Sequence, residues 1–121
     1  MAEIPIWIID REHWPRAYLV AELTGRGYDV RGFIDIEEAL AELRHGRDKW
    51  PSIIMLELRN QRITDAILGS LRHTGILVIG IGGATELGQE SVSSFAWAKL
   101  LKRPITIGLI ADTIEELIKR G

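Results

Sequence analysis

One short apolar run near the middle of the chain constrains the fold more than any other feature. Residues 52–58 read Ser-Ile-Ile-Met-Leu-Glu-Leu, and they lie between Pro51 and the polar stretch 59–62. A continuous apolar run of about four to eight residues between turn signals indicates a strand buried on both faces. Such strands belong to parallel sheets covered by helices on both sides, so this run predicts an α/β fold with Glu57 at a strand's carboxyl end.

The same apolar pattern recurs along the chain and alternates with amphipathic segments. We predict helix N-caps at Asp35, at Thr64 or Asp65, and at Thr106. The fourth helix should be weak, because Gly88 and three serines lower its helix propensity. The strands are predicted at 4–9, 28–33, 52–58, 76–81 and 98–101, and the helices at 12–24, 36–44, 65–74, 85–95 and 107–118. Five successive β-α units imply a doubly wound, five-stranded parallel sheet with right-handed crossovers and five helices.

Length and composition narrow the class of protein. A chain of 121 residues fits one domain, which we assign to residues 1–121. The net charge of −2 gives no basic surface for nucleic acid or membrane, and no apolar run approaches the roughly 20 residues that span a bilayer. The chain has no cysteine and its N-terminus has no basic region typical of a signal peptide, so we expect a cytoplasmic domain.

Three stretches resemble one known family, the receiver domains of bacterial response regulators. Residues 27–40, running from Gly-Tyr-Asp-Val to Asp-Ile-Glu-Glu-Ala-Leu, are similar to that family's second strand and the start of its second helix. The spacing from Asp10 to Gly27 and the sequence Lys-Arg-Pro at 102–104 also match. The resemblance covers almost the whole chain. It implies the flavodoxin-like or CheY-like fold with strand order 2-1-3-4-5, and a role in two-component signal transduction.

The resemblance also implies where the family's chemical groups fall on this chain. In receiver domains an acidic pair holds Mg²⁺, an aspartate accepts a phosphoryl group, a hydroxyl contacts the resulting phosphate, and a lysine neutralises charge. The corresponding positions are Asp10 and Arg11 for the acidic pair, Glu57 for the acceptor, Gly80 for the hydroxyl, and Lys102 or Arg103 for the lysine.

Most of these positions depart from the family pattern. Arg11 is a fixed positive charge where a metal-binding carboxylate would lie. Glu57 is one methylene longer than the aspartate nucleophile, and Gly80 has no hydroxyl. We therefore interpret the chain as a pseudo-receiver that has lost magnesium binding and phosphoryl transfer, has no cofactor and is not an enzyme.

The altered pocket suggests a replacement for the metal. We hypothesise that Arg11 and the basic residue at 102 or 103 pair with Glu57 and Asp10. Three alternatives stay open: the charges are merely solvated at a loop rim, Glu57 imitates a phosphorylated aspartate, or Glu57 or Asp10 still accepts a phosphoryl group.

The expected partner is a protein or the chain's own effector domain. Phe95 and Trp97 are candidate interface residues, because aromatic side chains are enriched at binding hot spots. A homodimer through the face of the fourth helix, fifth strand and fifth helix is the corresponding expectation from the resemblance. A sensor of small molecules or nucleotides that uses the glycine-rich loop 80–83 is the alternative function. The three histidines lie far apart in sequence and give no metal-ligand spacing.

Overall fold

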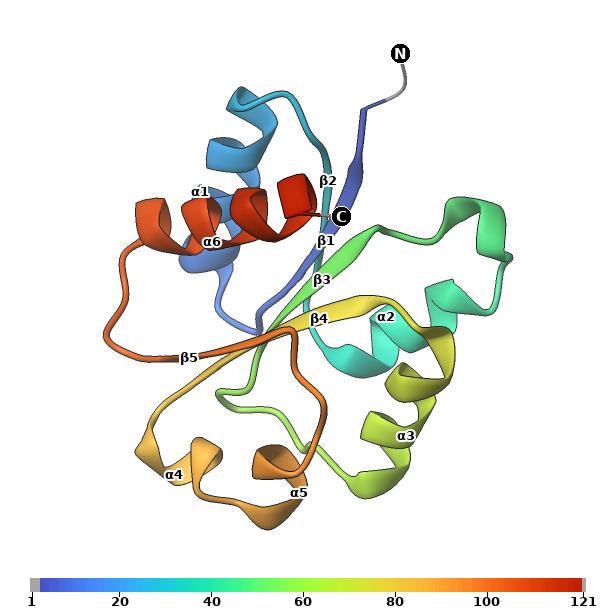
Figure 1. Ribbon diagram of the computed structural model, residues 1–121, viewed down its shortest axis with the longest axis vertical. Coiled ribbons are helices and arrows are strands. Elements are labelled where there is room, and N and C mark those ends of the chain that lie inside the picture. Colours follow the sequence, from blue (N-terminus) through green and yellow to red (C-terminus); the bar gives the residue numbers. More distant parts are fainter. Residues whose placement is uncertain (1–2, 121) are drawn as a thin grey trace.

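A central parallel sheet organises the fold (Figure 1). The structure is a computed structural model and describes residues 3–120. Within that range the strands are β1 (Pro5–Ile9), β2 (Asp29–Phe33), β3 (Ile53–Glu57), β4 (Leu77–Gly82) and β5 (Lys99–Lys102). The helices are α1 (His13–Gly25), α2 (Ile36–Leu43), α3 (Asp65–Thr74), α4 (Ala84–Leu87), α5 (Glu90–Ser93) and α6 (Ile107–Arg120), with a 3₁₀ turn at Arg47–Lys49.

The strand order is β2-β1-β3-β4-β5, and every neighbouring pair is parallel. This confirms the predicted topology. In the register of the central pair, Glu57 on β3 lies opposite Ile81 on β4. All five carboxyl ends therefore reach the same edge of the sheet, where the loops that follow them can meet.

Alternating side chains of the central strands fill two hydrophobic layers. On one face, Ile6, Ile8, Ile53, Met55, Ile79 and Ile81 pack against α1 and α6. On the other face, Trp7, Ile9, Ile54, Leu56 and Val78 pack against α2, α3 and the segment around α5. Figure 1 shows α1 and α6 side by side on one side of the sheet and α2 and α3 on the other. Burial on both faces explains why the strand sequences are continuously apolar.

The predicted helix caps are present. The Asp35 carboxylate accepts a hydrogen bond of 2.9 Å from the amide of Glu38, and the Thr64 hydroxyl accepts one of 3.2 Å from Ile67. The Thr106 hydroxyl likewise accepts one from an amide in the first turn of α6. Each cap satisfies a backbone donor that the helix itself cannot, which fixes where the helix begins.

The predicted single helix at 85–95 is wrong. The segment contains two short helices, α4 and α5, so that the described chain has six α-helices instead of five. Gly88 ends α4, and Gln89 then adopts an extended backbone (φ −71°, ψ 136°) before α5 begins. The low helix propensity of glycine and serine made the segment weak, and the backbone breaks at this point.

Phe95 and Trp97 belong to the hydrophobic layer on the α2–α3 side. Phe95 is only 7% exposed, and its ring lies 4.7 Å from that of Trp97 in an edge-on arrangement. The Trp97 indole N–H donates a hydrogen bond of 2.7 Å to the carbonyl of Val92. The prediction of Phe95 as an interface residue is therefore wrong, since its side chain fills the core, and the half-buried Trp97 packs over it. None of the helices in residues 3–120 is both long and apolar enough to span a bilayer.

Candidate functional site

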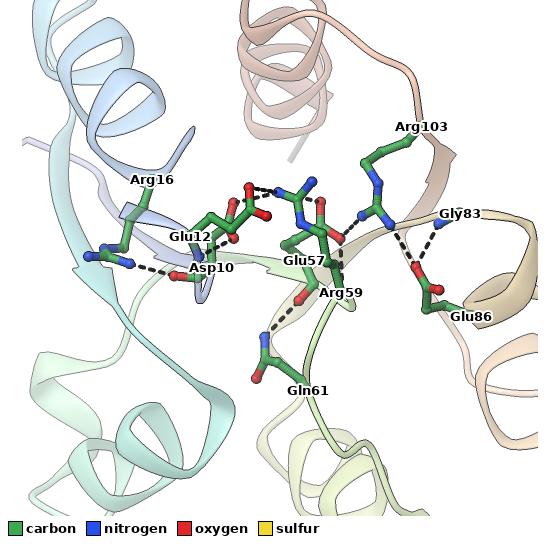
Figure 2. A network of polar contacts seen from close by, with 9 residues as sticks. All are labelled: Asp10, Glu12, Arg16, Glu57, Arg59, Gln61, Gly83, Glu86 and Arg103. Carbon is green, nitrogen blue, oxygen red and sulfur yellow. Dashed lines mark hydrogen bonds and ion pairs between the residues drawn. The ribbon is translucent and has the colours of Figure 1, made fainter. Parts of the chain in front are cut away.

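Five charged side chains converge at the carboxyl edge of the sheet (Figure 2). They follow four different strands and are Asp10 after β1, Glu57 and Arg59 at the end of β3, Glu86 after β4, and Arg103 after β5. Two of them, Asp10 and Glu57, are the polar or charged residues that lie buried within residues 3–120. A buried carboxylate needs a cationic or hydrogen-bonding partner, so the contacts around these two define the site.

Asp10 is held by the start of α1. One carboxylate oxygen, Oδ1, accepts a hydrogen bond of 2.9 Å from the amide of Glu12, and the Asp10 carbonyl accepts one of 2.6 Å from Nη1 of Arg16. Burial raises the pKa of Asp10 above its ordinary value, although the Glu12 amide and the Arg59 guanidinium oppose the shift. Loss of water at this carboxylate is only partly compensated by the protein.

Glu57 has closer partners. Its Oε1 accepts hydrogen bonds from the amide of Arg59, at 3.0 Å, and from Nη1 of Arg103. Burial nevertheless raises its pKa, because these donors do not fully offset the lost hydration. The Glu57 carbonyl accepts a hydrogen bond of 2.6 Å from the side chain of Gln61, whose own oxygen accepts one from the first amide of α2, that of Ile36. The loop after β3 is thereby fastened to α2.

Arg103 bridges two carboxylates. Nη1 contacts Glu57, and Nη2 donates a hydrogen bond of 2.8 Å to Oε1 of Glu86. Burial disfavours the charged guanidinium, but the bonds to Glu57 and Glu86 outweigh it and raise the pKa of Arg103. Glu86 also accepts a hydrogen bond of 2.9 Å from the amide of Gly83, and this bond, with the help of Arg103, lowers the pKa of Glu86.

Arg59 lies between the two buried acids. Its Nη2 is 3.1 Å from Oε2 of Glu12, 3.7 Å from Oδ2 of Asp10 and 3.9 Å from Oε2 of Glu57. Its Nε is buried and has no hydrogen-bond partner within residues 3–120. Figure 2 shows this guanidinium extending across the space between the Asp10 and Glu57 side chains.

The structure corrects one predicted pairing and decides another. Arg11 does not contact Glu57 or Asp10, so that prediction is wrong. Its side chain runs instead toward the β2–α2 loop, where Nη1 lies 3.5 Å from Oδ2 of Asp35, and it is 47% exposed. Arg103 rather than Lys102 reaches Glu57, while Lys102 is exposed at the end of β5.

Gly80 lies away from the charged cluster. A Cβ built on it would come within 2.8 Å of the Trp97 ring and of Leu100, so the position faces the α2–α3 layer. The glycine beside the cluster is Gly83, where a Cβ would lie 3.4 Å from Nη2 of Arg103. The prediction that Gly80 belongs to the charged pocket is therefore wrong, because successive strand residues point to opposite faces.

Sequence reasoning missed Arg59 and Glu86. Arg59 follows Glu57 by two residues in the polar stretch after a buried strand, so its position at the carboxyl edge could have been noticed. Glu86 gave a weaker signal, since it looks like any charged residue in a surface helix. Its role depends on Arg103, which arrives from a distant part of the chain.

The residues present do not fit a magnesium site. Mg²⁺ prefers about six oxygen ligands in nearly octahedral geometry. Here the space between the two buried carboxylates holds the Arg59 guanidinium, which is a permanent cation and offers no ligand. Within residues 3–120, no group of three or more acidic, histidine or cysteine side chains has the geometry to hold a metal ion.

Comparisons with solved structures identify the fold. The chain superposes on a response regulator receiver protein from Pseudomonas putida with a TM-score of 0.78 and 19% identity, covering 96% of this chain and 98% of that one. The receiver domain of NtrX from Brucella abortus gives 0.75 and 20%, with 96% and 99% covered. The structure of FixJ-N gives 0.73 and 22%, with 95% and 93% covered.

Comparisons by sequence give no assignment. No family model matches the chain, and no curated protein matches it by sequence. The three-dimensional likeness is nevertheless extensive, since each of these alignments covers more than nine-tenths of both chains. The chain therefore has the CheY-like fold of response regulator receiver domains.

Proposed function

We propose that the chain is a regulatory module of two-component type that acts through contacts with a protein partner or its own effector domain, without phosphorylation. Asp10 and Glu57 occupy the positions that the resemblance assigns to the metal-binding acid and the phosphoacceptor. The site is thus a receiver site whose chemistry is replaced by internal ion pairs. In this proposal the domain binds and does not catalyse.

One observation carries the proposal. The Glu57 carboxylate is 4% exposed and accepts hydrogen bonds from Arg103 and from the Arg59 amide. A carboxylate attacks phosphorus only with cationic help for the incoming phosphoryl oxygens. Here Arg103 is held by Glu57 and Glu86, and Arg59 is surrounded by three carboxylates, so both cations are engaged by the protein itself.

Phosphorylation is tested by incubating the purified chain with acetyl phosphate and Mg²⁺ and measuring the intact mass. A receiver domain known to be phosphorylated serves as the positive control. We expect no mass change for this chain. A stoichiometric gain of one phosphoryl group would refute the proposal. A second test is a Mg²⁺ titration monitored by the fluorescence of Trp14, which lines the same cavity as Asp10. Saturable Mg²⁺ binding in the micromolar range would also refute the proposal.

We propose that the edge formed by β5 and α6 mediates self-association. β5 is an edge strand, and Leu109 on α6 is 54% exposed beside it. Lys99 and Glu116 in the same shallow groove carry opposite charges, so a twofold axis could bring each against its opposite in a second copy. Leu109→Glu should then shift the mass measured by light scattering toward the monomer, whereas Ile34→Glu, at an exposed position directly after the opposite edge strand β2, should not. Equal masses for wild type and Leu109→Glu would refute this surface.

The glycine-rich loop gives little support to the alternative nucleotide sensor. The Gly83 amide, which would face a phosphate, already donates to Glu86. α4 has only four residues and offers a weak helix dipole. The neighbouring Glu86 carboxylate would also repel an anion.

A further inference from the structure

A cavity of about 300 Å³ opens beside the charged cluster. It lies between α1 and α6 on the face of the sheet that those helices cover, and the loop from β5 to α6 forms one wall. The volume is at the lower end of the range for small-molecule sites, roughly 300–1,000 Å³. At about 30 Å³ per water-sized atom, it suits a ligand of about ten non-hydrogen atoms.

Most of the cavity wall is apolar. Met55 and Ile81 come from the central strands, and aliphatic side chains from the two helices and the last loop complete the wall. These are Pro15, Leu19, Ile105, Ile107 and Ile110. An apolar wall around a space of this size binds the hydrophobic body of a ligand.

Two exposed aromatic side chains stand at the mouth. Trp14 and Tyr18 are 64% and 59% exposed and line the cavity. They are four residues apart on α1, so they share one helix face, and their rings stack at 28° with centroids 5.9 Å apart. Large aromatic side chains that remain in water beside an apolar cavity indicate a binding surface.

The inner polar end consists of the two buried carboxylates. Asp10 and Glu57 line the cavity, and each is at least 96% buried. Nη2 of Arg59 lies 3.7 Å from Oδ2 of Asp10 and 3.9 Å from Oε2 of Glu57, which is beyond hydrogen-bond distance, and the bonds to these two carboxylates within residues 3–120 go to their other oxygens. Each acid therefore has one oxygen that lacks a close donor.

The charge of the surrounding cluster favours a cation. Four carboxylates (Asp10, Glu12, Glu57 and Glu86) face three guanidiniums (Arg16, Arg59 and Arg103), which leaves one excess negative charge. Arg103 already pairs with two carboxylates and Arg59 lies close to three, and the Nε of Arg59 is buried. An anionic ligand would have to compete with these carboxylates for both guanidiniums, whereas an ammonium would supply the hydrogen bonds that the two acids lack.

We propose that this cavity binds a small aromatic amine, with its ring among the apolar side chains beneath Trp14 and Tyr18 and its ammonium group on Asp10 and Glu57. An ammonium group carries three N–H donors and, unlike Mg²⁺, needs no octahedral set of oxygen ligands, so it can bond to Oδ2 of Asp10 and Oε2 of Glu57. The Trp14 and Tyr18 rings at the mouth add aromatic contacts to the ring of the ligand. This proposal does not depend on how the domain signals.

The test is a titration with 2-phenylethylamine. Binding is measured by two-dimensional NMR of the backbone amide signals and by calorimetry. Two controls separate the contributions: 3-phenylpropionate keeps the ring and reverses the charge, and ethylamine keeps the charge and removes the ring. We expect saturable binding of the aromatic amine with a dissociation constant of about 1 mM or lower, ordinary for a probe this small, and at least about tenfold weaker binding of both controls.

Variants locate the site. Asp10→Asn should weaken binding of 2-phenylethylamine about tenfold, and Trp14→Ala, at an exposed position that leaves the core intact, should weaken it severalfold. Leu77→Ala is the matched control, because its side chain is also exposed but lies at the amino end of β4, away from the cavity at the carboxyl ends of the strands. If Asp10→Asn fails to fold, the charge comparison between the two aromatic probes tests the same contact. Equal or tighter binding of 3-phenylpropionate, unchanged binding by Trp14→Ala, or no saturable binding of the amine would overturn the proposal.

Discussion

The ion pair between Glu57 and Arg103 makes a quantitative prediction. Arg103→Met keeps most of the apolar stem of the side chain and removes the guanidinium, which leaves Glu57 buried with only the Arg59 amide and the distant Arg59 guanidinium. The carboxylate then either stays charged without its main partner or takes up a proton. The second route sets a ceiling on the loss of stability. Neutralising a glutamate of ordinary pKa 4.5 at about pH 7 costs about 1.36 kcal/mol per pH unit, or about 3.4 kcal/mol.

The expected loss lies below this ceiling. Burial already raises the pKa of Glu57 in the wild type, so part of the cost is present before the substitution. The lost contact with the partly exposed Glu86 adds at most about 1 kcal/mol. We expect Arg103→Met to lower the free energy of unfolding by about 2–3 kcal/mol at about pH 7, in line with the cost of breaking other buried pairs.

The pH dependence of this loss of stability shows whether the unpaired Glu57 carboxylate causes it. A carboxyl group whose pKa is higher in the folded state binds more protons when folded, so stability falls as pH rises from about 4.5 to the folded-state pKa. Removing Arg103 extends this window upward. The contribution of Glu57 to the loss should therefore shrink to at most about 0.7 kcal/mol at about pH 5.

The assay is urea unfolding of wild type and variant at both pH values. In a Glu57→Gln background, Arg103→Met should cost much less, because no buried charge is left unpaired. Arg31→Met is a matched control, since Arg31 pairs with Glu42 at the surface and its loss should not change between the two pH values. A loss below about 1 kcal/mol at about pH 7, or an equal loss at both pH values, would refute the proposed energetics of the pair.

Three further predictions concern the surroundings of the site. Gln61→Ala should lower the free energy of unfolding by about 1–3 kcal/mol, because it removes two hydrogen bonds that tie the Glu57 carbonyl to α2; unchanged urea unfolding would contradict this. Asp35→Ala should lower the free energy of unfolding by about 1 kcal/mol, because α2 loses its N-cap. Arg11→Ala should leave the denaturation midpoint unchanged, because Arg11 takes part only in a long and exposed ion pair. A large effect of Arg11→Ala would show that Arg11 contributes to the charged site. Gly80→Ala should lower the free energy of unfolding by about 1–3 kcal/mol, because the added methyl group would collide with Trp97. Gly69→Ala on α3, where an added Cβ meets nothing within 4 Å, should instead stabilise the protein by about 0.5–1 kcal/mol. Equal melting temperatures for the two variants would exclude the collision.

The sequence determined the fold because the rules that set it are local. The period of the apolar residues distinguishes doubly buried strands from amphipathic helices, and the alternation of the two leaves few topologies. Caps such as Asp35 and Thr64 act within a single helical turn, so they too can be read directly. The break after Gly88 follows from the same propensities, but a propensity does not say whether a weak helix bends or divides.

The position of the candidate site was also accessible from the sequence, since Asp10, Glu57 and Arg103 all follow strands of one parallel sheet. The ion-pair partners of these residues could not be predicted from the sequence. Arg11 lies next to Asp10 in sequence, yet its side chain pairs with Asp35 after β2 and not with the two buried acids. The cation between the two acids is Arg59, which arrives with a different loop.

Tertiary structure alone decided the pairings and the cavity. An arginine side chain is long and flexible, and several carboxylates lie within its reach, so its partner depends on how four loops meet. Burial of Phe95 and the free space beneath Trp14 likewise depend on how helices pack on the sheet. Residues a few positions apart in the sequence can thus specify the architecture of the chain. Ion pairs form only where distant segments meet, because electrostatic energy depends on distance in space and not on separation in sequence.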